Sequence, residues 1–226
     1  MIVYNNPIDL VKNEFGVSAK KQLYPIIQTG ELVFRDIVNE SPKIFNSNLF
    51  SSIIPKIRTR AIYCQFESDM LANDFPFKCR MRKVNNFNDH IPEIIIGNLV
   101  LHIAYTPKSD VLPSFAQYKD RYSNLNTFSQ KQMTFELSEN PLSIVGVTED
   151  KYYGVIAFGG KNELEFVNLI IPSPGFKGIL YKTNLKQEIK LVKIDTESST
   201  VTRRRLEIRE HILKEIEREG ERNATK

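Results

Sequence analysis

The sequence predicts an α+β fold: an N-terminal helical region, a mainly antiparallel sheet and a charged C-terminal helix. Three observations lead to this prediction. Apolar residues recur every three or four positions over 1–73, at alternate positions in runs over 75–195, and again at helical spacing over 202–222. Because a long amphipathic helix and a half-buried sheet each need an apolar partner surface, we expect 1–73 and 75–195 to share one core.

Composition narrows the class of protein before any motif is considered. The chain has 226 residues, 41% of them hydrophobic, which is enough to bury a sizeable core. Its two cysteines, Cys64 and Cys79, indicate neither a disulfide framework nor a zinc site. The first residues lack a basic leader before an apolar run, and no apolar segment approaches the ~20 residues that span a bilayer. We therefore expect a soluble cytoplasmic protein with no membrane association, no bound metal and no cofactor.

The N-terminal region is predicted to contain several short helices. An Asn-Pro pair at 6–7 is typical of a helix start, and Gly16 ends that helix. Ser18 can begin a second helix, which Pro25 disturbs and Gly30 separates from a third.

A longer helix follows and is the clearest periodic element. It is predicted to begin at Ser47 and to reach about Leu71. Its polar side carries Lys56, Arg58 and Arg60, which we expect to be solvated.

From residue 75 the pattern becomes that of strands joined by short turns. A Gly-Asn pair at 97–98 between apolar runs predicts a tight hairpin, with His102 on a strand buried on both faces. A short helix is predicted within 107–131, with its tyrosines toward the core and Lys119 in solvent. Further strands are predicted at 132–137, 142–147, 152–158, 163–171, 178–181 and 186–194. Short turns between successive strands favour antiparallel pairing throughout.

The strand at 77–83 carries the strongest functional signal. Alternation sends its apolar residues to one face and most of its basic residues to the other. Residues 75–130 hold seven basic against four acidic residues, so most of the net charge of +4 is concentrated there. Arginine carries a fork of donors that suits phosphate. The basic residues of this strand are Lys78, Arg80, Arg82 and Lys83.

These residues predict a non-enzymatic nucleic-acid-binding protein that contacts phosphates through the basic strand. The prediction requires the side chains to project together into water as an uncancelled positive surface. Three further arginines, Arg203, Arg204 and Arg205, lie at the start of the C-terminal helix and extend the expected footprint.

The C-terminal helix supports an alternative function. Its apolar face either docks on the chain's own core or binds a partner, as in an inhibitor, a regulatory module or a self-associating chain. The residues of this face are Leu206, Ile208, Ile212, Leu213 and Ile216.

A second alternative is a Mg²⁺-dependent nuclease. Such an enzyme needs acidic metal ligands, often with a lysine two residues away, and Glu149 and Glu188 each have one, at Lys151 and Lys190. No nucleophile elbow or phosphate-cradling loop accompanies them. The non-enzymatic interpretation is preferred, and no catalytic residue is assigned.

Overall fold

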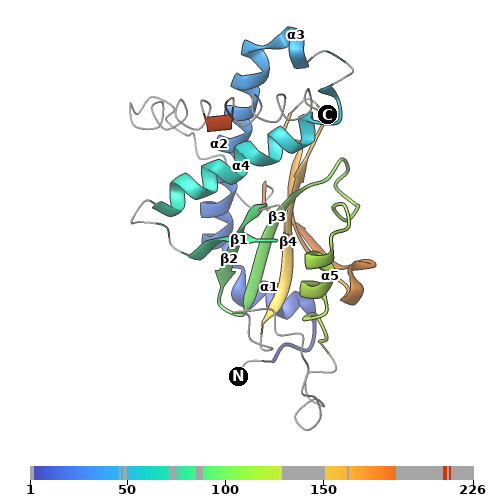
Figure 1. Cartoon of the computed structure of the whole chain (residues 1–226). Helices are drawn as coiled ribbons and strands as arrows, with labels where there is room; N and C mark the ends of the chain where they lie inside the picture. Colours follow the sequence, from blue (N-terminus) through green and yellow to red (C-terminus); the bar gives the residue numbers. More distant parts are fainter. Residues whose placement is uncertain are drawn as a thin grey trace. The chain divides into compact units, whose positions relative to one another are not determined.

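The chain combines helices with a six-stranded sheet, which confirms the predicted α+β class (Figure 1). The computed structural model describes residues 3–45, 47, 50–71, 75, 77–84, 89–128, 151–161, 163–186, 211, 212 and 214. Two compact units divide the chain. One consists of Met1–Lys21 and Pro76–Lys190, the other of Gln22–Phe75 and Leu191–Lys226.

In the first unit the strands lie in the sheet in the order in which they occur in the sequence. Strand β1 therefore stands at one end of the sheet and, within the described residues, pairs with β2 alone. The strands are β1 (Lys78–Lys83), β2 (His90–Ile96), β3 (Leu99–Tyr105), β4 (Tyr152–Gly159), β5 (Phe166–Pro172) and β6 (Ile179–Asn184).

The prediction of antiparallel pairing throughout is wrong at one place. Strands β3 and β4 run parallel, with Leu99 opposite Tyr152, while the other neighbouring pairs are antiparallel. A parallel pair needs a long crossover connection, and residues 106–151 supply one that includes helix α5 (Gln117–Ser123). The strands predicted at 132–137 and 142–147, and the last one from 187 onward, lie outside the described residues.

The predicted hairpin between β2 and β3 is confirmed. Gly97 has a φ of 53°, a conformation that glycine adopts without steric cost and that this type of tight turn requires. The two-residue turn places Ile96 opposite Leu99 and, further along, Glu93 opposite His102.

Helix α5 and the short turn η2 (Pro174–Phe176) cover one face of the sheet. The core on this side contains Val100, Ala104, Tyr122, Tyr153, Val155 and Phe176. On the opposite face Gly154 lies under Leu101 and Leu169. Strands β3, β4 and β5 are thus buried on both faces, which confirms the prediction made for β3, the strand of His102.

Helix α1 (Pro7–Glu14) begins as predicted. The Asn6 side chain accepts a hydrogen bond from the backbone N–H of Asp9 at 2.9 Å, and Pro7 occupies the first turn. The predicted break at Gly30 is wrong, because α2 (Val17–Glu40) runs through both Pro25 and Gly30.

Close packing against α4 (Ile54–Leu71) accounts for the glycine in the middle of α2. A Cβ atom at Gly30 would stand 2.6 Å from the Cα of Ile62. Glycine therefore serves here as the residue that lets two backbones approach, not as a helix terminator. Helix α4 itself begins at Ile54, later than the predicted start at Ser47, and α3 (Pro42–Phe45) precedes it.

The second unit has its own apolar core, to which the C-terminal segment contributes Ile212. Its buried members are Val33, Phe34, Ile37, Phe45, Ile57, Ala61 and Ile212. Arg58 was expected in solvent with its basic neighbours but is only 4% exposed, because it forms an ion pair with the buried Glu31.

Among the described helices, none combines the length and the apolar character needed to cross a bilayer.

Candidate nucleic-acid interface

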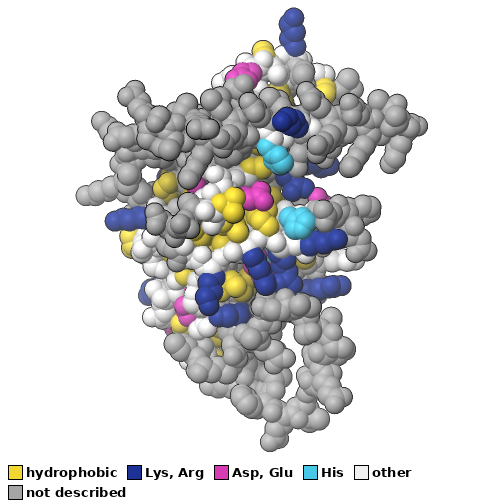
Figure 2. Space-filling view, turned by 60° about the vertical axis from the view of Figure 1, so that its left-hand side comes forward, with side chains coloured by type: hydrophobic (Ala, Val, Ile, Leu, Met, Phe, Trp, Pro, Cys, Tyr) yellow, Lys and Arg dark blue, Asp and Glu magenta, His cyan; other side chains and the backbone are white. Residues whose placement is uncertain are grey.

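The basic strand β1 presents its cations to different degrees. Lys78 and Lys83 are exposed, the side chain of Arg80 is 44% exposed, and that of Arg82 is only 19% exposed. Figure 2 brings forward the side on which β1 and β2 are drawn in Figure 1, and Lys and Arg side chains gather in the middle of that face. The edge of the sheet formed by β1 therefore offers positive charge to solvent, although not from all four side chains.

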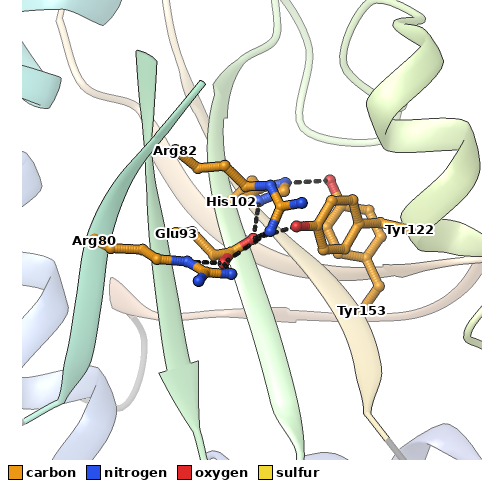
Figure 3. A network of polar contacts seen from close by, with 6 residues as sticks. All are labelled: Arg80, Arg82, Glu93, His102, Tyr122 and Tyr153. Carbon is orange, nitrogen blue, oxygen red and sulfur yellow. Dashed lines mark hydrogen bonds and ion pairs between the residues drawn. The ribbon is translucent and has the colours of Figure 1, made fainter. Parts of the chain in front are cut away.

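The expected uncancelled row of charges is wrong for Arg80 and Arg82. Both contact Glu93, which lies directly opposite Arg80 on β2 and is 0% exposed (Figure 3). The Nε atom of Arg80 donates to Glu93 Oε1 at 2.6 Å, and Nη2 of Arg80 lies 2.5 Å from the same oxygen. Arg82 Nη1 lies 3.3 Å from Glu93 Oε2. One buried carboxylate thus partners two arginines. The four basic residues of β1 and Glu93 together keep three net positive charges.

Behind this ion pair lies a polar network that the sequence did not reveal. His102 Nε2 is 3.4 Å from Glu93 Oε2, and His102 Nδ1 is 3.2 Å from the hydroxyl of Tyr153. Tyr122 of α5 donates a short hydrogen bond to Glu93, and the Arg82 guanidinium lies over its ring, 5.3 Å from the centroid. Four side chains from three other elements therefore converge on Glu93 (Figure 3).

Burial determines the charge of His102, and its hydrogen bonds determine which ring nitrogen carries the proton. An ionised carboxylate only accepts, so Nε2 carries the hydrogen toward Glu93. Burial lowers the pKa of His102 from its ordinary 6.5, although Glu93 opposes this effect, so the ring is neutral at pH 7. The unprotonated Nδ1 then accepts from the Tyr153 hydroxyl.

Glu93 remains ionised despite its burial. Burial by itself raises the pKa of Glu93, but hydrogen bonds from His102 and Tyr122, together with the Arg80 contact, outweigh it and lower the pKa to about 2. Burial of the Tyr122 hydroxyl, together with its hydrogen bond to Glu93, raises the pKa of Tyr122.

Acid is expected to destabilise the protein through this network. The folded-state pKa values of Glu93 and His102 both lie below their ordinary values of 4.5 and 6.5, so the unfolded chain binds more protons below those pH values. Stability is therefore lost as the pH falls below about 6.5 through His102 and, through Glu93, from 4.5 toward 2, by at most about 1.4 kcal/mol per pH unit for each proton.

Denaturant unfolding of the wild type and of Glu93→Gln at a series of pH values measures the contribution of Glu93. The variant lacks the carboxyl group, so its stability should vary less steeply between pH 4.5 and 2. Equal slopes for the two proteins would show that Glu93 does not titrate differently in the folded and unfolded states.

Helix α5 bears a second departure from expectation. Lys119 was expected in solvent but is only 6% exposed, and its Nζ donates to the backbone oxygen of Ser114 at 2.6 Å. Burial lowers the pKa of Lys119 to about 8. Tyr122 faces the core, as the helical spacing of the tyrosines predicted.

The other predicted site residues divide into two groups. Ile212 is 1% exposed within the second unit's own core, so it is not available to a partner. The remaining predicted residues of the C-terminal helix, Arg203, Arg204, Arg205, Leu206, Ile208, Leu213 and Ile216, lie outside the described residues.

Most residues of the predicted nuclease site fall beyond the part of the chain that the structure describes. Glu149, Glu188 and Lys190 lie outside the described residues, while Lys151 donates to the backbone oxygen of Gly97 at 2.7 Å. In the part of the chain that the structure describes, no three His, Cys, Asp or Glu side chains are grouped so as to hold a metal ion.

One signal in the sequence indicates the pairing of Glu93 with His102, which is part of this network. A two-residue turn at 97–98 pairs Glu93 with His102 by register alone, and a charged residue inside an apolar strand needs a partner. The pairing of Arg80 with Glu93 has no comparable signal, because no two-residue turn in the sequence sets the register of β1 against β2.

Comparison of the chain with protein-family models, curated proteins and solved structures gives no match.

Proposed function

We propose that the protein binds nucleic acid through the exposed cations of β1 and that it does so without catalysis. The observation that carries the proposal is the net positive edge of the sheet: of the four basic residues on β1, only Arg80 and Arg82 share the buried carboxylate of Glu93, while Lys78 and Lys83 remain exposed. Phosphate backbones bind such surfaces mainly through charge.

The four basic residues of β1 differ in exposure, so we assign them different roles. Lys78 and Lys83, at the two ends of the strand, supply mobile point charges for phosphates. Arg80, half exposed between them, supplies a guanidinium whose inner side is held by Glu93. Arg82 lies mostly beneath the surface and serves the internal network.

Like charges along β1 also oppose pairing of this edge with a second copy of the same edge, because cations would then face cations. This property is compatible with a phosphate-binding role, since the same side chains serve both. It also makes edge-to-edge dimers a poor alternative explanation of the basic pattern.

Removing the two exposed lysines is expected to weaken binding and its dependence on salt. The variant Lys78→Ala/Lys83→Ala loses two phosphate contacts, so the slope of log K against log salt should fall by about 1.4 for single strands and about 1.8 for duplex. Fluorescence anisotropy with a short oligonucleotide of each kind, between about 50 and 200 mM salt, measures both quantities.

The matched control replaces exposed lysines elsewhere in the same unit. Lys161 and Lys177 are both exposed and lie outside β1, and their replacement by alanine should leave the salt slope unchanged. If the wild type shifts neither oligonucleotide at low salt, or if the control and the β1 variant weaken binding equally, the proposal is lost.

A further inference from the structure

We infer that Glu93 is a positioning residue, which orients the guanidinium of Arg80 so that β1 recognises phosphate through an aligned fork of donors and not through charge alone. This inference rests on the proposed nucleic-acid-binding function. It names a buried acid as a contributor to the binding of an anion.

The geometry at Arg80 carries the first step. Glu93 Oε1 receives both Nε and Nη2 of Arg80, at 2.6 and 2.5 Å, which fixes the plane of the guanidinium. A guanidinium has five N–H donors, and those not directed at Glu93 remain for another acceptor. Because the Arg80 side chain is 44% exposed, that acceptor can come from solvent.

The rigidity of Glu93 carries the second step. The carboxylate is 0% exposed and is held from its other side by Tyr122, His102 and Arg82. A carboxylate on a flexible exposed side chain could follow Arg80 toward a ligand, whereas this one cannot. The orientation of Arg80 is therefore set before the ligand arrives, which reduces the conformational entropy lost on binding.

The two exposed lysines provide the internal contrast. Lys78 and Lys83 are exposed, and no carboxylate is directly opposite either of them, since their cross-strand neighbours are Ile95 and His90. An ammonium group on a flexible stem contributes charge with little geometry. Affinity for nucleic acid is therefore expected to depend on the shape of the head group at Arg80, whereas the two lysines contribute through their charge.

The experiment compares substitutions that conserve charge. Arg80→Lys keeps the positive charge but removes the fork, so affinity for the oligonucleotide should fall about tenfold, the loss that corresponds to one charge-assisted hydrogen bond. Its salt slope should remain that of the wild type, because the number of neutralised phosphates is the same. The matched controls, Lys161→Arg and Lys177→Arg, change exposed lysines outside β1 and should leave affinity unchanged.

Glu93→Gln is expected to lower the affinity for the oligonucleotide, whereas charge alone would raise it. Removing the carboxylate adds one net positive charge to the surface, which by charge alone strengthens binding to a polyanion. The loss of positioning weakens it. Weaker binding by Glu93→Gln with a native circular dichroism spectrum supports the inference; stronger binding overturns it.

Arg80→Lys keeps the inference testable if Glu93→Gln fails to fold, since Arg80 is half exposed. Wild-type affinity in Arg80→Lys, together with weakened binding in Lys78→Ala/Lys83→Ala, overturns the positioning role and leaves the proposed function in place. Absence of oligonucleotide binding by the wild type overturns the proposed function itself, and the inference with it.

Discussion

Replacing Glu93 with alanine is expected to lower the free energy of unfolding by about 3–5 kcal/mol, the range for breaking a buried ion pair by removing one partner. The substitution leaves Arg82, which is only 19% exposed, and the fully buried His102 without their acceptor. It also removes the acceptor of the Tyr122 hydroxyl and leaves a small cavity. Chemical denaturation at pH 7 measures the loss.

Glu163→Ala is the matched control for this experiment. Glu163 is an exposed glutamate in the loop between β4 and β5 of the same unit, so its replacement should change stability by no more than about 0.5 kcal/mol. A loss at Glu93 no larger than that at Glu163 would mean that the network contributes nothing net to folding. Such a result would also remove the physical basis for a fixed Arg80 guanidinium.

Arg58→Met is expected to destabilise the second unit by a similar amount, about 3–5 kcal/mol. Arg58 donates from Nε and Nη2 to the two oxygens of Glu31, at 2.7 and 2.8 Å, and both residues are almost completely buried. Methionine fills much of the volume but leaves the carboxylate of Glu31 inside the protein without its forked partner.

Two further variants distinguish this mechanism from a general loss of packing. Lys56→Met changes an exposed residue of the same helix and should alter stability by no more than about 0.5 kcal/mol. Adding Glu31→Leu to Arg58→Met removes both charges, so the double variant should recover much of the stability that the single variant loses. A double variant as unstable as the sum of its single variants would contradict a role for the ion pair.

Much of the fold was predictable because its signals are local. The cap at Asn6, the turn at Gly97 and the strand that begins after residue 77 each depend on neighbours in sequence, and the structure confirms all three. The prediction fails at Gly30 because a glycine in a helical pattern resembles a terminator, whereas here glycine is needed for the close approach of Ile62, which is far away in sequence.

The candidate site was predictable only in part for the same physical reason. The positions of the basic residues on β1 follow from side-chain alternation, which is a property of the strand itself. Their partner does not, because Arg80 and Glu93 are 13 residues apart in the sequence and meet only through the pairing of β1 with β2.

By itself, the sequence determined the class of the fold, the basic strand and the identity of its four cations, since periodicity and charge are properties of the chain. The tertiary structure alone decided which of those cations face solvent. Burial makes the difference: Glu93, Tyr122 and His102 come from segments that only folding brings together, and in the resulting apolar surroundings one carboxylate holds two arginines.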